Sequence, residues 1–262
     1  MELGIGTVVG RIIGLWRYPV KSMGGEVLAS VEAGEAGFAG DRSFGVIDVA
    51  SGALLSAKRV PQLLAGTARY RDDGEVLMML PGDVVVSSDD ADVNAILGEW
   101  LGRSVYLDRP SPGQQARIEI EVDLDDPSAV REFTTGPGLF FDSSVLHLLS
   151  DVSLRAAAAL HPSGDWVPER FRPNVLIEAT GEGFVEDSWV GAMLDVSGMR
   201  VFVHKRCDRC VLTTRAFGDA VADKEILRAL ARGHGGDLGV KAHIAGAGRV
   251  FVGDEVRVVG AE

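Results

Sequence analysis

The stretch HKRCDRCVLTT, residues 204–214, holds the only two cysteines of this 262-residue chain, Cys207 and Cys210, in a C-x-x-C spacing. An alternating apolar run leads into it from residue 199, and apolar and β-branched residues lead out. This pattern predicts that the cysteines lie at a bend between two strands, where backbone amides and side chains converge on a ligand. Because positive charge favours the ionised form of a thiol, Arg206 and Arg209 indicate a reactive or metal-ligating sulfur.

Three other interpretations of the cysteine pair stay open on the residues alone. A structural zinc site needs two further ligands, and the five histidines form no second pair at zinc spacing. A thioredoxin-like redox pair sits at the start of a helix, whereas β-branched residues follow here. Two inert, partly buried thiols are the third interpretation.

The charge, the cysteine count and the apolar segments of the sequence exclude several classes of protein. The net charge of −12 argues against general binding of nucleic acid or of an anionic membrane surface, because both need a basic face. Two cysteines make no disulfide framework, so a reducing cytoplasm is expected. Arginines interrupt the apolar N-terminal segment, and no stretch has the length of a membrane span. We therefore expect a soluble, cytoplasmic protein that contacts neither nucleic acid nor membrane.

Short strand-like runs at close spacing predict a mostly β or α+β fold, barrel-like and covered by a few helices. A hairpin turn is expected at Asp73–Gly74 and a helix over 92–101. Two further helices are expected over 150–160, with Ser150 or Asp151 as its cap, and over 223–231, with Gly233 as its stop. The segment PSPGQQ at 110–115 is the best linker signal, followed by an acidic stretch at 123–128. We place the division between a β-rich domain over 1–110 and a second domain over 111–262.

Four polar stretches interrupt the apolar pattern where strands begin or end. They are YPVKS at 18–22, GDR at 40–42, RFRPN at 170–174 and the cysteine stretch. Each offers a cation, so together they could form a pocket for a phosphate or another oxyanion. The alternative is that each cation is a solvated surface residue and that Asp41–Arg42 is a structural ion pair. Phosphate-loop, zinc-protease and nucleophile-elbow motifs are absent from the sequence.

Taken together, these stretches resemble the MOSC family, named for the C-terminal domain of molybdenum cofactor sulfurase. The resemblance is closest to the branch that contains the mitochondrial amidoxime-reducing component and its bacterial relatives. It runs from about residue 8 to 259 through an ordered set of short motifs: YPVKS at 18–22, GDR at 40–42, FRPN at 171–174, EDSW at 186–189, CDRCVLTT at 207–214, GV at 239–240 and VGDEV at 252–256.

The resemblance implies a β-rich N-terminal domain and a MOSC β-barrel, with a molybdopterin-type molybdenum cofactor between them. It makes Cys210 the thiolate ligand of molybdenum and the catalytic residue, while Cys207 matches a position that is not a ligand. Asp187 would be structural. The residues implied in binding the pterin and its phosphate are Lys21, Ser22, Arg42, Ser143, Arg172, Asn174 and Arg209.

The leading hypothesis is therefore a molybdenum-dependent oxidoreductase that reduces N-oxygenated compounds such as hydroxylamines and amidoximes. Bacterial relatives with a C-terminal ferredoxin domain extend further than this chain, which ends after its last expected strand at Glu262. Electrons are thus expected from a separate ferredoxin- or flavin-type protein. Two alternatives remain: a non-catalytic carrier of the cofactor or of sulfur, and a protein that binds a pyridoxal-phosphate-type ligand, a traditional association of the family.

Overall fold

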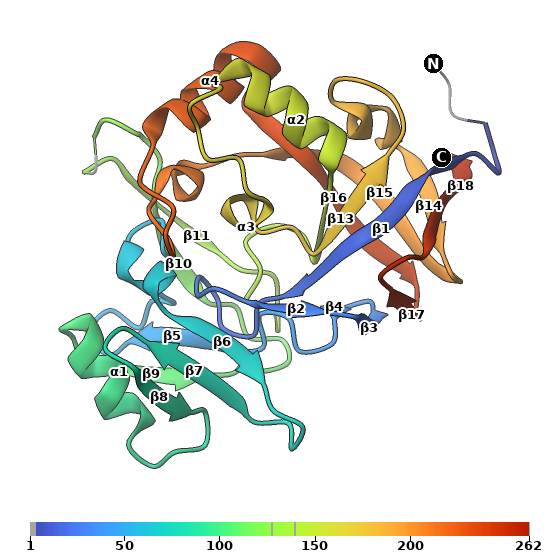
Figure 1. The fold of residues 1–262 in the computed structure, drawn as a ribbon. Helices are drawn as coiled ribbons and strands as arrows, with labels where there is room; N and C mark the ends of the chain where they lie inside the picture. Colours follow the sequence, from blue (N-terminus) through green and yellow to red (C-terminus); the bar gives the residue numbers. More distant parts are fainter. Residues whose placement is uncertain (1–3, 127, 139, 262) are drawn as a thin grey trace.

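Seven strands drawn from both ends of the chain close into a β-barrel (Figure 1). The computed structural model describes residues 4–126, 128–138 and 140–261. Around the barrel the strands run in the order β13-β12-β16-β15-β14-β18-β1, and β1 pairs back onto β13. Their bounds are β1 (Val8–Arg17), β12 (Leu146–Ser150), β13 (Val175–Ala179), β14 (Ala192–Val196), β15 (Met199–Asp208), β16 (Asp237–Gly246) and β18 (Glu255–Ala261).

Alternation of apolar residues explains why these strands roll up. Along β1, Ile12 and Leu15 are buried, whereas Arg11 and Ile13 face outward. Residues facing inward on all seven strands form one continuous apolar core. Burial of that core provides the main free energy that closes the barrel. The first strand of the chain therefore completes a barrel whose other strands come from beyond residue 145.

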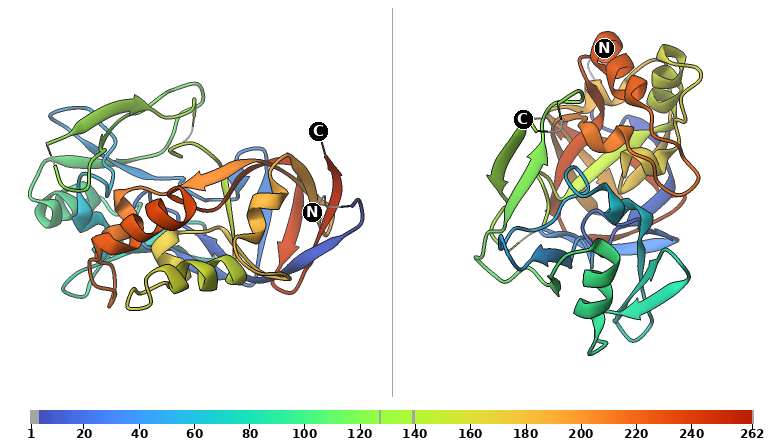
Figure 2. Two further views of the ribbon diagram at one scale, coloured as in Figure 1. Left: turned by 90° about the horizontal axis from the view of Figure 1, so that it is seen from above. Right: turned by 90° about the vertical axis from the view of Figure 1, so that its left-hand side faces the viewer.

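Buried apolar residues between 20 and 105 form a second core. The strands and the helix that carry most of it lie beside the barrel in Figures 1 and 2. A three-stranded meander of β6 (Thr67–Tyr70), β7 (Val76–Leu80) and β8 (Val84–Ser87) packs with helix α1 (Val93–Leu101). The predicted hairpin at Asp73–Gly74 is confirmed, because β6 and β7 pair across it and Gly74 has a φ of 89°. The pair β5 (Gly45–Asp48) and β9 (Val105–Asp108) completes this part.

Smaller elements fill in around the barrel. Strand β2 (Glu26–Leu28) pairs antiparallel with the end of β1. A short sheet joins β17 (Gly248–Phe251), β3 (Ser30–Gly34) and β4 (Gly37–Phe38). Helices α2 (Asp151–Leu160) and α4 (Lys224–His234) lie together against the outside of the barrel, above the short helix α3 (Pro168–Phe171) in Figure 1. The short 3-10 helices are η1 (Pro61–Ala65), η2 (Val185–Trp189) and η3 (Val211–Thr214).

The N-terminal cap of α2 is the one expected from the sequence, whereas the C-terminal end of α4 differs from the expected one. The Ser150 side chain accepts a hydrogen bond from the Ser153 amide, which confirms it as the cap of α2. The expected stop of the last helix at Gly233 is wrong, because α4 runs to His234 and ends at Gly235 with a φ of 63°. Gly235 takes the left-handed position at the C-terminal end of the helix, which glycine adopts without strain.

The segment at 110–115 lies outside the strands, and an unexpected hairpin of β10 (Arg117–Glu121) and β11 (Val130–Thr134) follows it. The expectation for the cysteine stretch is wrong. The cysteines do not lie between two strands: β15 runs through Cys207 to Asp208, and the 3-10 helix η3 follows Cys210. Strand β11 shows no apolar alternation, and the short alternation of β10 at Ile118 and Ile120 lies between the linker signal and the acidic stretch, where a loop was expected.

The fold class is confirmed as mostly β, with a closed barrel and few helices. The division of the chain at residue 110 stays a prediction. Across the described residues, no helix combines the length and apolar character needed to cross a membrane.

Candidate functional site

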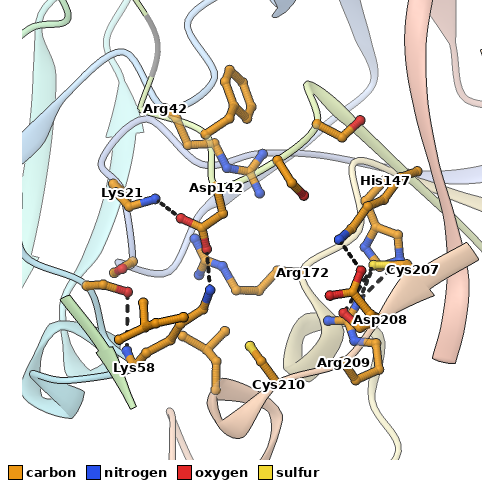
Figure 3. A pocket seen from close by; sticks show the side chains of 18 of the residues that line it. Lys21, Arg42, Lys58, Asp142, His147, Arg172, Cys207, Asp208, Arg209 and Cys210 are labelled. Carbon is orange, nitrogen blue, oxygen red and sulfur yellow. Dashed lines mark hydrogen bonds and ion pairs between the residues drawn. The ribbon is translucent and has the colours of Figure 1, made fainter. Parts of the chain in front are cut away.

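A cavity of about 300 Å³ opens where the barrel meets the N-terminal half of the chain (Figure 3). Of the eight residues singled out from the sequence, seven line it: Lys21, Ser22, Arg42, Ser143, Arg172, Arg209 and Cys210. Asn174 does not line the cavity. The convergence of the polar stretches is therefore observed, whereas their roles in binding stay predictions.

Unusual backbone geometry marks this cavity. Five described residues other than glycine have a positive φ, and Ser22, Arg42 and Arg172 are three of them, at 71°, 47° and 53°. Left-handed backbone is unfavourable for residues with a Cβ, and such strain collects where function requires a particular side-chain placement. The strain at three cavity residues therefore supports a functional site.

One carboxylate bridges two lysines on one side of the cavity (Figure 3). Asp142 accepts from Lys21 through Oδ1, and its Oδ2 lies 2.7 Å from Nζ of Lys58. Lys21 also donates to the carbonyl of Phe140 at 2.8 Å. Burial alone would raise the pKa of Asp142, but the two lysines outweigh it and hold this pKa below its usual value.

The two lysines differ in electrostatic environment. Burial lowers the pKa of Lys21, and Asp142 opposes this only in part. For Lys58 burial also disfavours the charge, but Cys210 and then Asp142 outweigh it and raise its pKa. Lys58 is thus held as a cation beside the Cys210 sulfur.

Cys210 is positioned by the turn that follows it. Its carbonyl accepts from the amide of Thr213 at 3.0 Å and from the Thr213 hydroxyl at 2.9 Å, which starts η3. Arg170 fixes the same turn from behind, because its guanidinium donates to the carbonyls of Thr213 and Arg215, each at 3.1 Å. Arg170 is fully buried and does not line the cavity, so it is a structural residue.

The arginines beside the cysteines act differently from the expectation. Arg206 is turned away and pairs with Asp237 at 3.2 Å and with Asp187 at 3.4 Å. Arg209 does face the cavity, but its Nη1 donates to Cys207 Sγ at 2.8 Å. Both cysteines are free thiols. Lys58, which comes from the other half of the chain, lines the same cavity as Cys210, and Cys210 helps to raise the pKa of this lysine.

Asp187, expected to be structural, is held away from the cavity by contacts with His234 and Arg206. Its Oδ2 lies 2.9 Å from Nε2 of His234, besides its contact with Arg206. Neither Asp187 nor His234 lines the cavity. The structural interpretation of Asp187 therefore agrees with its contacts.

Asn174 ties together the elements that carry the cavity residues. Its Nδ2 donates to Asp41 Oδ2 at 2.8 Å, and its Oδ1 accepts from the His147 amide at 3.2 Å. Asp41 also accepts from the amide of Tyr18 at 2.8 Å and pairs with Arg42. The Asp41–Arg42 ion pair is thus present, and it orients a guanidinium that also lines the cavity.

Buried guanidinium groups complete the electrostatics of the site. Arg172 donates to the carbonyl of Met23 at 2.6 Å and lies 4.2 Å from the ring centre of Tyr18. Burial lowers the pKa of Arg172 to about 10, so the group stays charged at neutral pH. The Nε–H of Arg209 is buried and has no hydrogen-bond partner among the described residues.

Sequence reasoning missed several cavity residues: Lys58, Asp142, His147, Lys205, Asp208 and Lys241. Lys58 directly follows the largely apolar segment LLSA at 54–57, and this position could have marked it as a candidate. Asp142 follows two phenylalanines in the same way. A charged residue embedded in an apolar stretch is seldom placed there without a partner.

Family models match two parts of the chain: the "MOSC N-terminal beta barrel domain" over residues 9–95 and the "MOSC domain" over residues 135–257. A curated relative, mitochondrial amidoxime reducing component 2 of Bos taurus, is 24% identical over 247 residues, covering 83% of this chain and 70% of the relative.

Solved structures show weaker likeness. The YuaD protein of Bacillus subtilis is 12% identical with a TM-score of 0.49, covering 97% of each chain. The YiiM protein of Geobacillus stearothermophilus is 12% identical with a TM-score of 0.35, covering 45% of this chain and 55% of its own. The two family matches lie in the order expected from the sequence motifs. The chain therefore belongs to the MOSC family and carries a MOSC N-terminal β-barrel domain ahead of its MOSC domain.

Proposed function

We propose that this protein is a molybdenum-cofactor-dependent oxidoreductase that reduces N-oxygenated compounds, with Cys210 as a ligand of the metal. The observation that carries the proposal is the single cavity in which a thiol meets cationic side chains from both halves of the chain. Membership of the MOSC family and the distant amidoxime-reducing relative support the same assignment.

The chemistry of the cavity fits an anionic cofactor that brings metal ligands with it. Among the described residues, no group of three or more His, Cys, Asp and Glu side chains could hold a metal ion. A metal bound here would thus take one sulfur from the protein and its other ligands from the cofactor, and soft thiolates suit such a centre. The guanidinium groups of Arg172 and Arg209 line the cavity and suit a phosphate.

Each side of the cavity has a distinct task in this proposal. Lys21, Ser22, Arg42, Ser143, Arg172 and Arg209 would hold the pterin and its phosphate, and Asn174 would orient Arg42. When bound, the molybdenum centre would supply the electron pair that reduces an N–O bond. Lys58 would stabilise negative charge beside Cys210, because it is held as a cation there. Phe133, Phe140 and Leu212 would exclude water from the same space.

We also propose that the electrons come from a separate ferredoxin- or flavin-type protein, because the curated relative is named as a component of a reducing system. The proposed location is the cytoplasm, where the two free thiols would stay reduced.

The test is elemental analysis for molybdenum on protein purified from a host that makes the cofactor, combined with turnover of an amidoxime under a chemical reductant. We expect near-stoichiometric molybdenum and turnover, both lost in Cys210→Ala. Arg206→Met is the matched control, because Arg206 lies in the same stretch but faces away from the cavity. Metal-free protein from such a host would contradict the proposal. Bound cofactor without turnover would favour the carrier alternative. The absorbance spectrum of a pyridoxal adduct would favour a protein that binds a pyridoxal-phosphate-type ligand.

A further inference from the structure

The second cysteine of the pair has a place in the structure but no task in the proposed function. Cys207 lies in β15 and is only 5% exposed. Its neighbour Arg206 is exposed and pairs with acids on the outside. We propose that Cys207 is a positioning residue: its sulfur accepts a hydrogen bond from Nη1 of Arg209 and orients this guanidinium in the cavity wall.

Local irregularity of β15 explains why Cys207 faces inward. Pairing of β15 with β16 shifts register between Val203 and Lys205 and again between Arg206 and Asp208. Such bulges re-aim side chains, because an extra residue breaks the strict alternation of the strand. Lys205 and Arg206 are consequently both exposed, and Cys207 is buried against Arg209.

The Arg209 guanidinium is held on several sides. Its Nη1 lies 2.8 Å from Cys207 Sγ, and its Nη2 donates to the Phe171 carbonyl at 2.8 Å. His147 Nε2 is a longer contact of Nη1 at 3.4 Å, and it also lies 3.3 Å from the carbonyl of Leu238. The sulfur is therefore the nearest side-chain acceptor of Nη1. With both Nη groups engaged, the Nε–H remains the unpartnered donor.

This arrangement divides the C-x-x-C motif between two tasks. Cys210 begins η3 and faces the cavity, whereas Cys207 acts through Arg209 rather than on a ligand. A thiol can accept from a guanidinium and still fill an apolar site, because sulfur is soft and polarizable. The inference deepens the proposed function and rests on it only in taking the cavity to bind an anion.

A direct test follows the side-chain Nε–H signal of Arg209 by NMR in the ¹⁵N-labelled full chain, with Arg209→Met to assign it. Cys207→Val removes the acceptor at similar volume, and Cys207→Ser keeps one. We expect the Arg209 signal to shift or broaden in Cys207→Val and to be largely restored in Cys207→Ser, with Arg206→Met unchanged. An unaltered Arg209 signal in Cys207→Val would overturn the proposal, whatever the protein binds.

A second measurement is a double-mutant cycle on the affinity of the cofactor-free full chain for inorganic pyrophosphate, read by isothermal titration calorimetry. Cys207→Val should weaken binding about tenfold in the wild-type background and have no further effect in Arg209→Met. An equal loss in both backgrounds would show a merely structural role for Cys207 and overturn the inference. Absent pyrophosphate binding in the wild type would instead count against the proposed function, while the NMR result still decides the role of Cys207.

Discussion

Replacing His147 by glutamine should remove a large part of the acid sensitivity of this fold. His147 is buried in the wall of the cavity, and burial, followed by the charge of Arg209, lowers its pKa from 6.5 to about 3. The folded protein thus keeps the ring neutral, whereas the unfolded chain binds a proton below about pH 6.5. Protonation of the unfolded state favours unfolding, so stability falls as the pH drops from about 6.5 toward 3.

The magnitude follows from the difference between the two pKa values. One pH unit below the unfolded pKa is worth about 1.4 kcal/mol, so between about pH 7.5 and about pH 5 His147 alone costs roughly 2 kcal/mol. Glutamine keeps a polar side chain and does not titrate in this range. Between the same two pH values, we therefore expect the free energy of unfolding of His147→Gln to fall by roughly 2 kcal/mol less than that of the wild type.

Urea unfolding at both pH values measures this difference. The control is Gln62→Asn, because Gln62 is exposed and carries no titratable group, so the variant should keep the pH dependence of the wild type. Equal pH dependence of the wild type and His147→Gln would refute the reasoning, since His147 would then titrate alike in both states. A variant too unstable to measure at pH 5 would be compared over the pH range in which it stays folded.

Three further predictions concern the same cavity. Lys58→Met should weaken the affinity for pyrophosphate about tenfold, because a charge-assisted contact is lost, and calorimetry with unchanged affinity would contradict this. Arg170→Met should cost about 3 kcal/mol or more in urea unfolding, because it leaves the buried carbonyls of the Cys210 turn without donors; a loss below about 1 kcal/mol would contradict it. Brief maleimide treatment of the folded, cofactor-free protein should label Cys210 and not the buried Cys207, as mass spectrometry would show; preferential labelling of Cys207 would reverse the assignment.

Elements with a strong local signal could be predicted from the sequence. The alternation along β1 and the Asp–Gly turn between β6 and β7 both depend on residues close together in the chain. So does the cap of α2 by Ser150. The hairpin of β10 and β11 was not predicted, because β11 has no such periodicity and the short alternation of β10 stands between two loop-like stretches.

Candidate cavity residues could be chosen from the sequence, but the role of each residue could not be predicted from it. Arg170 and Arg172 are two positions apart, yet one braces a turn and the other lines the cavity. The separation arises at Arg172, whose left-handed backbone ends α3 and redirects the chain. Arg206 and Arg209 are likewise separated by bulges in β15 that no local pattern reveals.

The lysines on either side of Asp142 depend on contacts between distant segments. Lys58 and Asp142 are 84 residues apart, and Lys21 and Asp142 are 121 apart. Their pairing exists only once the N-terminal half packs against the barrel. The same packing brings Lys58 into the cavity with Cys210. The sequence pattern had instead indicated Arg206 and Arg209 as the cations near this sulfur.

The most direct test of the proposed site is X-ray absorption at the molybdenum edge of the protein purified with its cofactor. The account predicts a molybdenum centre with a protein sulfur ligand that is lost in Cys210→Ala and kept in Cys207→Val. A spectrum that is unchanged in Cys210→Ala, or protein without molybdenum, would contradict the claim that Cys210 and the cations of both halves form a molybdenum cofactor site.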